Sequence, residues 1–547
     1  MKLRPYQQEA VSAVIDAWKQ ARSTMIVMPT GCGKTIVMSE LVRRVFPRRV
    51  MFLAHREELI FQARDKIENL TGFKTEIEMA DSHVTQNGLF NEPQVVISTI
   101  QTQTTGGDGA GRMGKFVPDD FGYLFCDEGH HAVSSSWKRA IKHYQQNHNL
   151  KILGVTATPD RLDKNALGQV FDSVAYEYEA IDAIRQGWLV PIEQQMIRVE
   201  GLDFSGVRTT AGDLNGKDLA KVLEFERNLH GFADPTIKLT QGKRTLVFAA
   251  SVAQAERLSD ILNRHMPNCS TWVCGKTDKQ KRRKIISDFA SDKIQYVVNC
   301  GVFTEGFDDP GVSSIVMARP TKSRSLYTQM AGRGMRPLAG VVDGLDSDAA
   351  RCAAIAASAK KSCLVLDFVG NSGRHKLMTS ADILGGNYPD EIVERAIERA
   401  KREGRPMRMD EALEEENAKM EAEREARKLA DQARKAKLIA KAKFTATTID
   451  PFDAFNITPQ PTYSKDSKKH LTEKQESILL KQGIDPDRMS YNQARQLLEE
   501  QFRRWHENLC TLKQASLLKR YGYETKDLKM KDASAIIDGL ARNGWRI

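Results

Sequence analysis

Short apolar runs alternate with segments that repeat apolar residues at helical spacing along the first two thirds of the chain. Runs of about four to eight apolar residues suit buried strands, whereas apolar residues three or four positions apart indicate amphipathic helices. Alternation of the two patterns is typical of an α/β fold with parallel sheets. We expect strands at 25–28, 50–54, 95–99 and 123–126, and a second series that begins with 244–251, 296–300 and 312–317. The pattern predicts two α/β units in tandem.

The composition changes beyond about residue 385. Residues 391–443 are rich in Ala, Glu, Lys and Arg with few large apolar side chains, which favours a long exposed helix. A basic stripe along it could follow phosphates, but a solvated helix is the interpretation we favour. Residues 445–469 contain three prolines and many Ser and Thr, a composition that indicates a flexible linker.

The end of the chain contains a duplication. Thr472–Gly483 matches Thr511–Gly522 at an offset of 39 residues. Each copy predicts a helix with a threonine N-cap, a glycine stop and a second helix. Neither copy could bury enough apolar surface alone, so we expect the two to pack together. The predicted organisation is 1–190 for the first lobe, 191–386 for the second, 387–445 for the charged helical segment, 446–470 for the linker and 471–547 for a small all-α module.

Length and charge add limited information. A chain of 547 residues with 41% hydrophobic and 28% charged residues is typical of a soluble protein of three or four domains. It shows neither a signal-type apolar region at its start nor a membrane-length apolar run, and its eight cysteines are scattered, so we expect a cytoplasmic protein with reduced thiols. The net charge of +10 weakly favours a polyanionic partner.

The first candidate site is the stretch Met28–Thr35, which lies between an expected strand and an expected helix. Gly31 and Gly33 let successive backbone N–H groups face one anion, Lys34 suits β/γ-phosphates, and the Thr35 hydroxyl suits Mg²⁺. Met28 stands where this pattern usually has its first glycine. The alternative, a glycine turn that binds nothing, is weakened by the second site.

That second site is Asp127-Glu128-Gly-His130, which ends an apolar strand. Open α/β sheets place ligands at the carboxyl ends of their strands. We expect Asp127 to hold Mg²⁺ and Glu128 to activate the water that attacks the γ-phosphate. His130 has no partner at metal-ligand spacing, so we expect it to couple the nucleotide site to its neighbours. Thr156 and Thr158 end another strand, with hydroxyls placed where the first lobe meets something else.

Gln7 precedes the phosphate loop by about one helix. Its side-chain amide offers one donor and one acceptor, which suits an adenine edge. A plain surface glutamine is an equally good interpretation of this residue alone.

The motifs Arg4-Pro-Tyr-Gln7, Gly31–Thr35, Asp127-Glu-Gly-His130 and Thr156-Ala-Thr158, followed by Thr304–Asp308 and Gln329–Arg336, resemble a superfamily 2 DExH-type helicase. The segments 304–311, 319–323 and 366–375 look like the XPB-like branch. The resemblance covers about residues 1–377 and implies two RecA-like lobes. By the same resemblance, Arg4, Gln7, Thr30, Gly31, Cys32, Gly33, Lys34, Thr35, Gly306 and Asp308 bind nucleotide, while Arg56, Thr99, Ser251 and Thr304 contact the phosphate backbone of nucleic acid.

The resemblance also assigns Gln329, Arg333 and Arg336 to catalysis. Arg333 and Arg336 are three residues apart, so we expect them on one helix face, where they act as arginine fingers on the transferring phosphoryl group.

The function predicted from these observations is an ATP-dependent nucleic-acid motor that uses ATP and Mg²⁺, most simply a DNA helicase. Two alternatives remain open: a duplex translocase that does not unwind, and a nucleic-acid sensor or recombination mediator that ATP switches. DNA is favoured over RNA, and the C-terminal repeats suit either nucleic-acid binding or docking of a protein.

Overall fold

The structure is a computed structural model that describes residues 3–55, 57–79, 82, 84, 93–105, 112–157, 168, 170–210, 212–304, 307–372, 375–386, 388–439, 450–461 and 470–545. The chain divides into two compact units. The first comprises residues 1–386 and 396–412, and the second comprises residues 387–395 and 413–547. Within the described residues, no helix is both long and apolar enough to cross a membrane.

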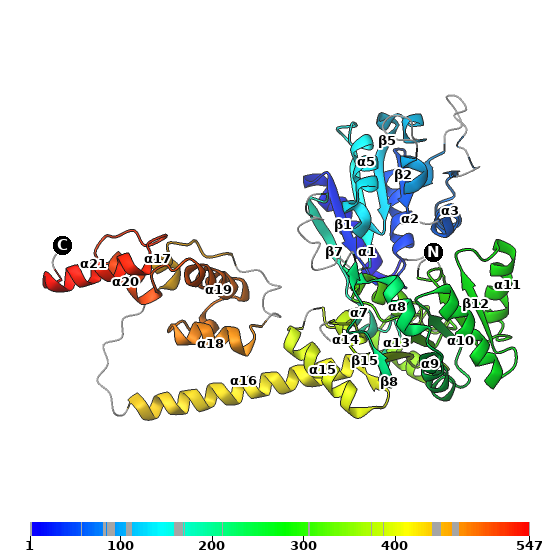
Figure 1. Ribbon diagram of the computed structural model, residues 1–547. Coiled ribbons are helices and arrows are strands. Elements are labelled where there is room, and N and C mark those ends of the chain that lie inside the picture. Colours follow the sequence, from blue (N-terminus) through cyan, green and yellow to red (C-terminus); the bar gives the residue numbers. More distant parts are fainter. Residues whose placement is uncertain are drawn as a thin grey trace. The chain divides into compact units, whose positions relative to one another are not determined.

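The first lobe is built on a seven-stranded sheet in the order β3-β4-β2-β5-β6-β1-β7, and every neighbouring pair is parallel. Strands β1, β2, β5 and β7 of this sheet are labelled in Figure 1. Every residue of β1 and of β4 is buried, as expected for strands covered on both faces. The strands are β1 Ser23–Val27, β2 Arg49–Ala54, β3 Thr75–Glu78, β4 Val95–Thr99, β5 Phe121–Asp127, β6 Lys151–Thr156 and β7 Ser173–Glu177.

The helices of this lobe follow the strands, as the alternating pattern predicts. Trp18 shows how one of them docks: its indole N–H donates to the carbonyl of Ile152 on β6 at 3.2 Å, and its ring packs against Phe125. The helices are α1 Pro5–Gln20, α2 Lys34–Val45, α3 Glu57–Thr71, α4 Ile100–Thr104, α5 Ser135–Tyr144 and α7 Ala180–Arg185.

The second lobe repeats this plan with a sheet in the order β12-β13-β11-β14-β15-β8-β16. Its strands are parallel except β16, which pairs antiparallel with β8 through Met407 opposite Gln194. The strands are β8 Ile192–Asp203, β11 Thr245–Phe248, β12 Ser270–Cys274, β13 Tyr296–Cys300, β14 Ser314–Met317, β15 Cys363–Asn371 and β16 Met407–Arg408.

The pairing of β16 corrects the predicted end of this lobe at residue 386. Residues 396–412 belong to the first unit, so the chain returns to the second sheet after the point where we expected the charged segment to begin. Two RecA-like parallel sheets in tandem nevertheless confirm the predicted fold class.

The helices of the second lobe enclose a core around Phe232, Val298 and Leu366. A two-stranded antiparallel ribbon, β9 Thr209–Thr210 and β10 Asp213–Leu214, lies between β8 and the first of these helices. The helices are α8 Gly216–Leu223, α9 Glu226–Leu239, α10 Val252–His265, α11 Lys279–Ala290, α12 Arg324–Gly332, α13 Asp348–Ala357 and α14 Ser380–Leu384.

After α15 (Asp390–Glu403), the described part of the second unit is helical. The repeats begin as predicted, because the Thr472 and Thr511 hydroxyls accept from the N–H groups of Gln475 and Gln514 in matching capping boxes. Gly483 and Gly522 follow with φ of 81° and 79°. The helices are α16 Met409–Ile439, α17 Pro451–Phe455, α18 Glu473–Lys481, α19 Tyr491–His506, α20 Leu512–Lys519 and α21 Met530–Arg542.

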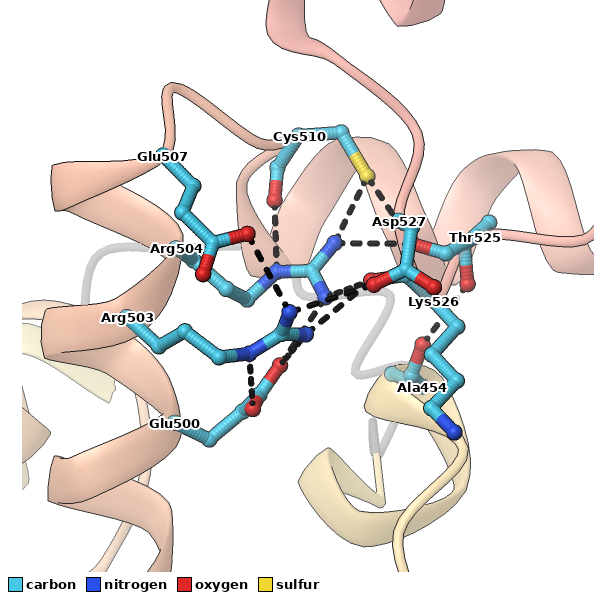
Figure 2. Close-up of polar contacts among 9 residues, drawn as sticks. All are labelled: Ala454, Glu500, Arg503, Arg504, Glu507, Cys510, Thr525, Lys526 and Asp527. Carbon is cyan, nitrogen blue, oxygen red and sulfur yellow. Dashed lines mark hydrogen bonds and ion pairs between the residues drawn. The ribbon is translucent and has the colours of Figure 1, made fainter.

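A buried arginine links the parts of this module. The Arg504 guanidinium donates to the carbonyls of Cys510, Thr525 and Lys526 at 2.9, 2.9 and 3.0 Å, as Figure 2 shows. The Thr525 hydroxyl in turn donates to the carbonyl of Ala454 in α17 at 3.1 Å. Arginine satisfies several carbonyls at once because it presents five donors in a fixed geometry.

The position of α17 overturns part of the predicted linker. Phe452 and Phe455 belong to the same core as Leu479, Leu497 and Leu518 of the repeats, so residues 450–461 are part of the module and do not form a flexible connection. The rest of the predicted linker, residues 446–449 and 462–469, lies outside the described residues.

Candidate ATP-hydrolysis site

The phosphate loop joins β1 to α2 through two glycines in the left-handed region. Gly31 has φ of 94° and Gly33 has φ of 78°, values that residues with a Cβ atom rarely adopt. A Cβ atom on Gly33 would lie 2.6 Å from Nε2 of Gln7. The helix begins at Lys34, so its unpaired N–H groups and Thr35 lie at the loop, as an anion site requires.

The first turn of α1 and its N-cap Arg4 support this loop. Gln7 is buried, and its Nε2 donates to the carbonyl of Cys32 at 3.1 Å while its Oε1 accepts from the N–H of Arg4 at 3.0 Å. The Tyr6 hydroxyl donates to the same Cys32 carbonyl at 3.1 Å. Burial raises the pKa of the Cys32 thiol to about 12, so this cysteine is a neutral packing residue of the loop.

Three strand ends bring the remaining first-lobe residues together. The order β5-β6-β1, with Asp127 opposite Val155 and Thr156 opposite Val27, places the phosphate loop, Asp127 and Thr156 at one edge of the sheet. Glu128 follows directly with φ of 52°, a left-handed value that is uncommon for a residue with a side chain. Backbone strain of this kind clusters at functional sites.

The Glu128 carboxylate lies between Lys34 and His130. Its Oε1 lies 3.7 Å from Nζ of Lys34, and its Oε2 lies 3.4 Å from Nδ1 of His130. Burial acts to raise the pKa of the Glu128 carboxyl, but Lys34 and the neighbouring His130 outweigh it and hold that pKa well below its usual range. The carboxylate is therefore ionised at neutral pH, the state in which it can accept a proton.

His130 also contacts the third strand end. Its Nδ1 lies 3.0 Å from Oγ1 of Thr156, which is fully buried. The structure thus brings the two predicted coupling residues into contact and connects both to Glu128. Thr158, the third predicted coupling residue, lies outside the described residues.

Thr35 and Asp127 offer oxygen donors suited to Mg²⁺. Oδ1 of Asp127 accepts the N–H of Glu128 at 3.0 Å, which fixes the carboxylate at the end of β5. Among the described residues no group of three or more His, Cys, Asp or Glu could hold a metal ion by itself. One carboxylate and one hydroxyl suit Mg²⁺ in nucleotide sites, because this ion keeps several waters and takes further ligands from the phosphates.

The arginine pair differs from the prediction. Helix α12 ends at Gly332, so Arg333 caps it and Arg336 lies beyond it, and the two do not share a helix face. Arg333 donates to the carbonyls of Thr304 and Phe307, both at 2.6 Å, while Arg336 forms an ion pair with Asp308. Gln329 is buried in the last turns of α12, and Gly306 lies outside the described residues.

The turn that carries both arginines lies directly on the phosphate loop. A Cβ atom on Gly332 would lie 2.6 Å from Cβ of Thr30, and one on Gly31 would lie 3.1 Å from Cγ of Arg336. Residues from the two lobes are therefore in contact around the loop, which is where the transferring phosphoryl group of a bound nucleotide belongs.

The predicted nucleic-acid contacts lie at strand ends in both lobes. Thr99 and Ser251 are N-caps of α4 and α10, and their hydroxyls accept from the N–H groups of Thr102 and Gln254. The Thr304 hydroxyl is buried and has no hydrogen-bond partner among the described residues. Arg56 lies outside the described residues.

Two groups near the nucleotide site escaped the sequence patterns. Two guanidiniums contact the Trp188 ring, with Cζ of Arg4 at 4.6 Å and Cζ of Arg351 at 3.9 Å from its centroid. Arg4 also pairs with Asp343 of the second lobe at 3.6 Å. Lys66 of α3 has its pKa lowered, first by burial and then by Arg336, despite the opposing charge of Asp127. Neither residue belongs to a short motif, so only proximity in the fold reveals them.

Comparisons with known proteins agree with this geometry. Residues 1–161 match the family described as type III restriction enzyme, res subunit, and residues 228–337 match the helicase conserved C-terminal domain. The chain is 28% identical over 510 residues to a protein named ATP-dependent helicase IRC3 in Saccharomyces cerevisiae, an alignment that covers 87% of this chain and 68% of the relative.

Two further relatives extend this result. The Schizosaccharomyces pombe protein named mitochondrial ATP-dependent helicase irc3 is 28% identical over 403 residues, 72% of this chain and 61% of its own length. A Sulfurisphaera tokodaii protein named DNA 3'-5' translocase XPB2 is 23% identical over 376 residues, 61% of this chain and 79% of that one. The chain thus spans about two thirds of the length of its yeast relatives.

Two RecA-like lobes with a phosphate loop at the cleft define an ATP-hydrolysing enzyme of the helicase class. Its two matched domains and its similarity to proteins named as ATP-dependent helicases support a superfamily 2 helicase. This confirms the predicted superfamily and the predicted ATP hydrolase, and the XPB2 relative is consistent with the XPB-like branch.

Proposed function

We propose that this protein is a DNA motor that hydrolyses ATP between its two lobes and moves along or unwinds nucleic acid. The observation that carries the proposal is the contact of the Gly332–Arg336 turn with the phosphate loop, since Gly332 lies against Thr30 and Arg336 lies against Gly31. DNA is the preferred polymer, because the name of one archaeal relative describes it as a DNA translocase.

In this proposal Lys34 and the N–H groups at the start of α2 bind the phosphates, and Gln7 with Arg4 holds the base. Glu128 takes a proton from the attacking water, a role that needs the ionised carboxylate. A Mg²⁺ ion held by Thr35 and Asp127 would neutralise charge on the phosphates.

Arg336 would contribute charge to the phosphoryl group from the other lobe, after exchanging Asp308 for phosphate oxygens. Arg333 would act at the same turn while keeping Thr304 and Phe307 in place through its contacts with their carbonyls. Because Thr304 is itself a candidate phosphate contact, nucleotide and nucleic acid would meet within one short segment. His130 and Thr156 would couple nucleotide binding to nucleic-acid binding within the first lobe.

The direct test is ATP hydrolysis measured with single-stranded, duplex and forked DNA and with the matching RNAs. We expect strong stimulation by DNA. Displacement of a triplex strand measures translocation, and separation of a forked duplex measures unwinding, so the two assays together decide between helicase and translocase. Equal ATP hydrolysis with and without every polymer would contradict the proposal.

Two finer assignments belong with this proposal. We place the protein in a reducing intracellular compartment, which suits its eight free cysteines. We assign the C-terminal module a binding role, since Phe502 and Trp505 are 48% and 46% exposed on α19. Large exposed aromatic side chains are typical of binding surfaces.

A further inference from the structure

The loop after β12 and the helix α11 that follows it are unusually basic. Between Gly275 and Lys284 the chain has six cationic residues and a single acidic one, Asp278. The cationic residues are Lys276, Lys279, Lys281, Arg282, Arg283 and Lys284.

Three of these charged residues have structural partners. The Arg282 guanidinium donates to the carbonyls of Cys274 and Gly275, which fastens the loop. Asp278 caps the helix by accepting from the N–H groups of Gln280 and Lys281. Lys279 pairs with Glu57 at the start of α3 in the first lobe, at 2.6 Å.

The four remaining cations, which we call the α11 patch, are Lys276, Lys281, Arg283 and Lys284. All four side chains are exposed, and none forms an ion pair with a carboxylate in the part of the chain that the structure describes. Lys281 and Lys284 are three residues apart on the helix, a spacing at which like charges repel. The patch therefore does not stabilise its own helix, and a polyanion would be its natural partner.

The patch lies at the edge of the sheet where the candidate nucleic-acid contacts lie. Strands β12, β13 and β11 are parallel neighbours, and their carboxyl ends lead to the patch, to Thr304 and to Ser251 in turn. Neighbouring strands are about 4.8 Å apart, so the patch continues this series outward by one strand. The Lys279–Glu57 ion pair places the start of α11 against Glu57 of the first lobe. Glu57 follows Arg56 in the chain.

We propose that the α11 patch lengthens the phosphate-binding track, gripping the backbone of the same nucleic-acid strand where it leaves the two lobes. This inference rests on the proposed function, because it assumes that a strand crosses Ser251 and Thr304. The α11 patch would contact only nucleic-acid strands that are long enough to extend beyond Ser251 and Thr304.

The test uses the full-length protein and fluorescent single-stranded DNA of increasing length. The patch variant is Lys281→Gln, Arg283→Gln and Lys284→Gln combined. The matched control neutralises three exposed cations at the opposite edge of the same sheet, Lys238→Gln, Arg264→Gln and Lys293→Gln, which precede β11, β12 and β13. All six side chains are exposed, so both variants should fold.

We expect the patch variant to bind long strands more weakly, with a salt dependence of log affinity reduced by about 0.7 per lost contact. Its affinity for the shortest strand that the wild type binds should stay unchanged. The control variant should match the wild type at every length. Replacing Lys281 and Lys284 by arginine should retain the wild-type slope, because the charge remains.

Three results would overturn the inference: equal behaviour of patch and control variants, equal loss at every length, or loss confined to blunt duplex DNA. Each of these leaves the proposed function intact, because the wild type still binds DNA. Failure of the wild type to bind any nucleic acid would instead contradict the proposed function, and the inference with it.

Discussion

Nζ of Lys34 lies 3.7 Å from Oε1 of Glu128, so the phosphate-loop cation and the candidate general base form one ion pair. A nucleotide whose phosphates draw Lys34 toward them would loosen this pair. The Glu128 carboxylate would then lose Lys34, the main group that stabilises its ionised form. Its proton affinity would therefore rise at the step in which it accepts a proton from water.

Substitutions at this pair should separate binding from turnover. Glu128→Gln should retain ATP binding and lower the hydrolysis rate by about 10²- to 10⁴-fold, since it removes the base and keeps the shape. Lys34→Ala should lose both, because it removes charge from the phosphates. Binding of a labelled ATP analogue and release of phosphate measure the two properties. A Glu128→Gln protein that turned over at the wild-type rate would refute the assignment.

The pH profile of ATP hydrolysis should respond to His130. In the nucleotide-free enzyme the Glu128 pKa is depressed, so the carboxylate stays ionised and kcat/KM persists as pH falls toward about 5. In His130→Ala the loss of the neighbouring imidazole lets that pKa rise, and the acid limb of the profile should move to higher pH. His148→Ala, at an exposed position, is the control. An unmoved acid limb in His130→Ala would contradict this coupling.

The two arginines should behave differently from each other. Arg336→Ala should bind nucleotide nearly normally and hydrolyse it about 10³-fold more slowly, because a finger acts on charge that develops in the transition state. Arg333→Ala should also spare nucleotide affinity, but it should in addition reduce stimulation by DNA, since Arg333 holds the Thr304 carbonyl. Steady-state rates with and without DNA test both, and equal stimulation in Arg333→Ala would argue against the second effect.

Trp188 should influence which base the enzyme accepts. Trp188→Leu removes the surface on which Arg4 lies, a contact worth about 0.5–2 kcal/mol. We expect KM for ATP to rise between roughly twofold and thirtyfold with little change in kcat, and the preference for ATP over GTP to fall. Trp505→Leu, in the other unit, controls for the loss of a tryptophan. A parallel fall of kcat with both nucleotides would indicate a purely structural role.

The position of the last strand decides where the chain can be shortened. A chain ending at Ala412 should fold and hydrolyse ATP, because it retains the whole first unit. A chain ending at Gly386 loses β16 and should unfold at lower temperature, since Gln194 and Glu193 of β8 lose their edge partners. Thermal unfolding and DNA binding against salt compare the two with the full chain. Identical melting of both shortened chains would contradict this boundary.

Much of the nucleotide site could be predicted because its residues follow strands. Asp127, Thr156 and the phosphate loop each end an apolar run, and parallel strands bring such ends to one edge. The His130–Thr156 contact follows from the same rule, because both residues lie at ends of neighbouring parallel strands. In contrast, Arg336 does not lie on the expected helix face, because α12 ends at Gly332. The spacing of residues alone does not show where a helix ends.

The other differences come from elements too short for periodicity. Strand β16 has two residues, so no alternation can reveal it. Helix α17 was hidden by the Pro, Ser and Thr around it, yet Asp450 before Pro451 is a usual helix start and could have been recognised. Trp188 acquires its role from Arg4 and Arg351, which are far from it in sequence, and no local pattern carries that information.

Gly332 lies where the two lobes are in contact, and the space around its α carbon is very small. The α carbon there has just enough clearance from Thr30 for hydrogen, and a methyl group would fall 2.6 Å from the threonine Cβ. One alanine at this position would therefore act as a spacer of atomic thickness that props the lobes apart. Such a protein could still hold nucleotide on Lys34 and polymer on Ser251, with the arginines kept too far away to act on the phosphoryl group.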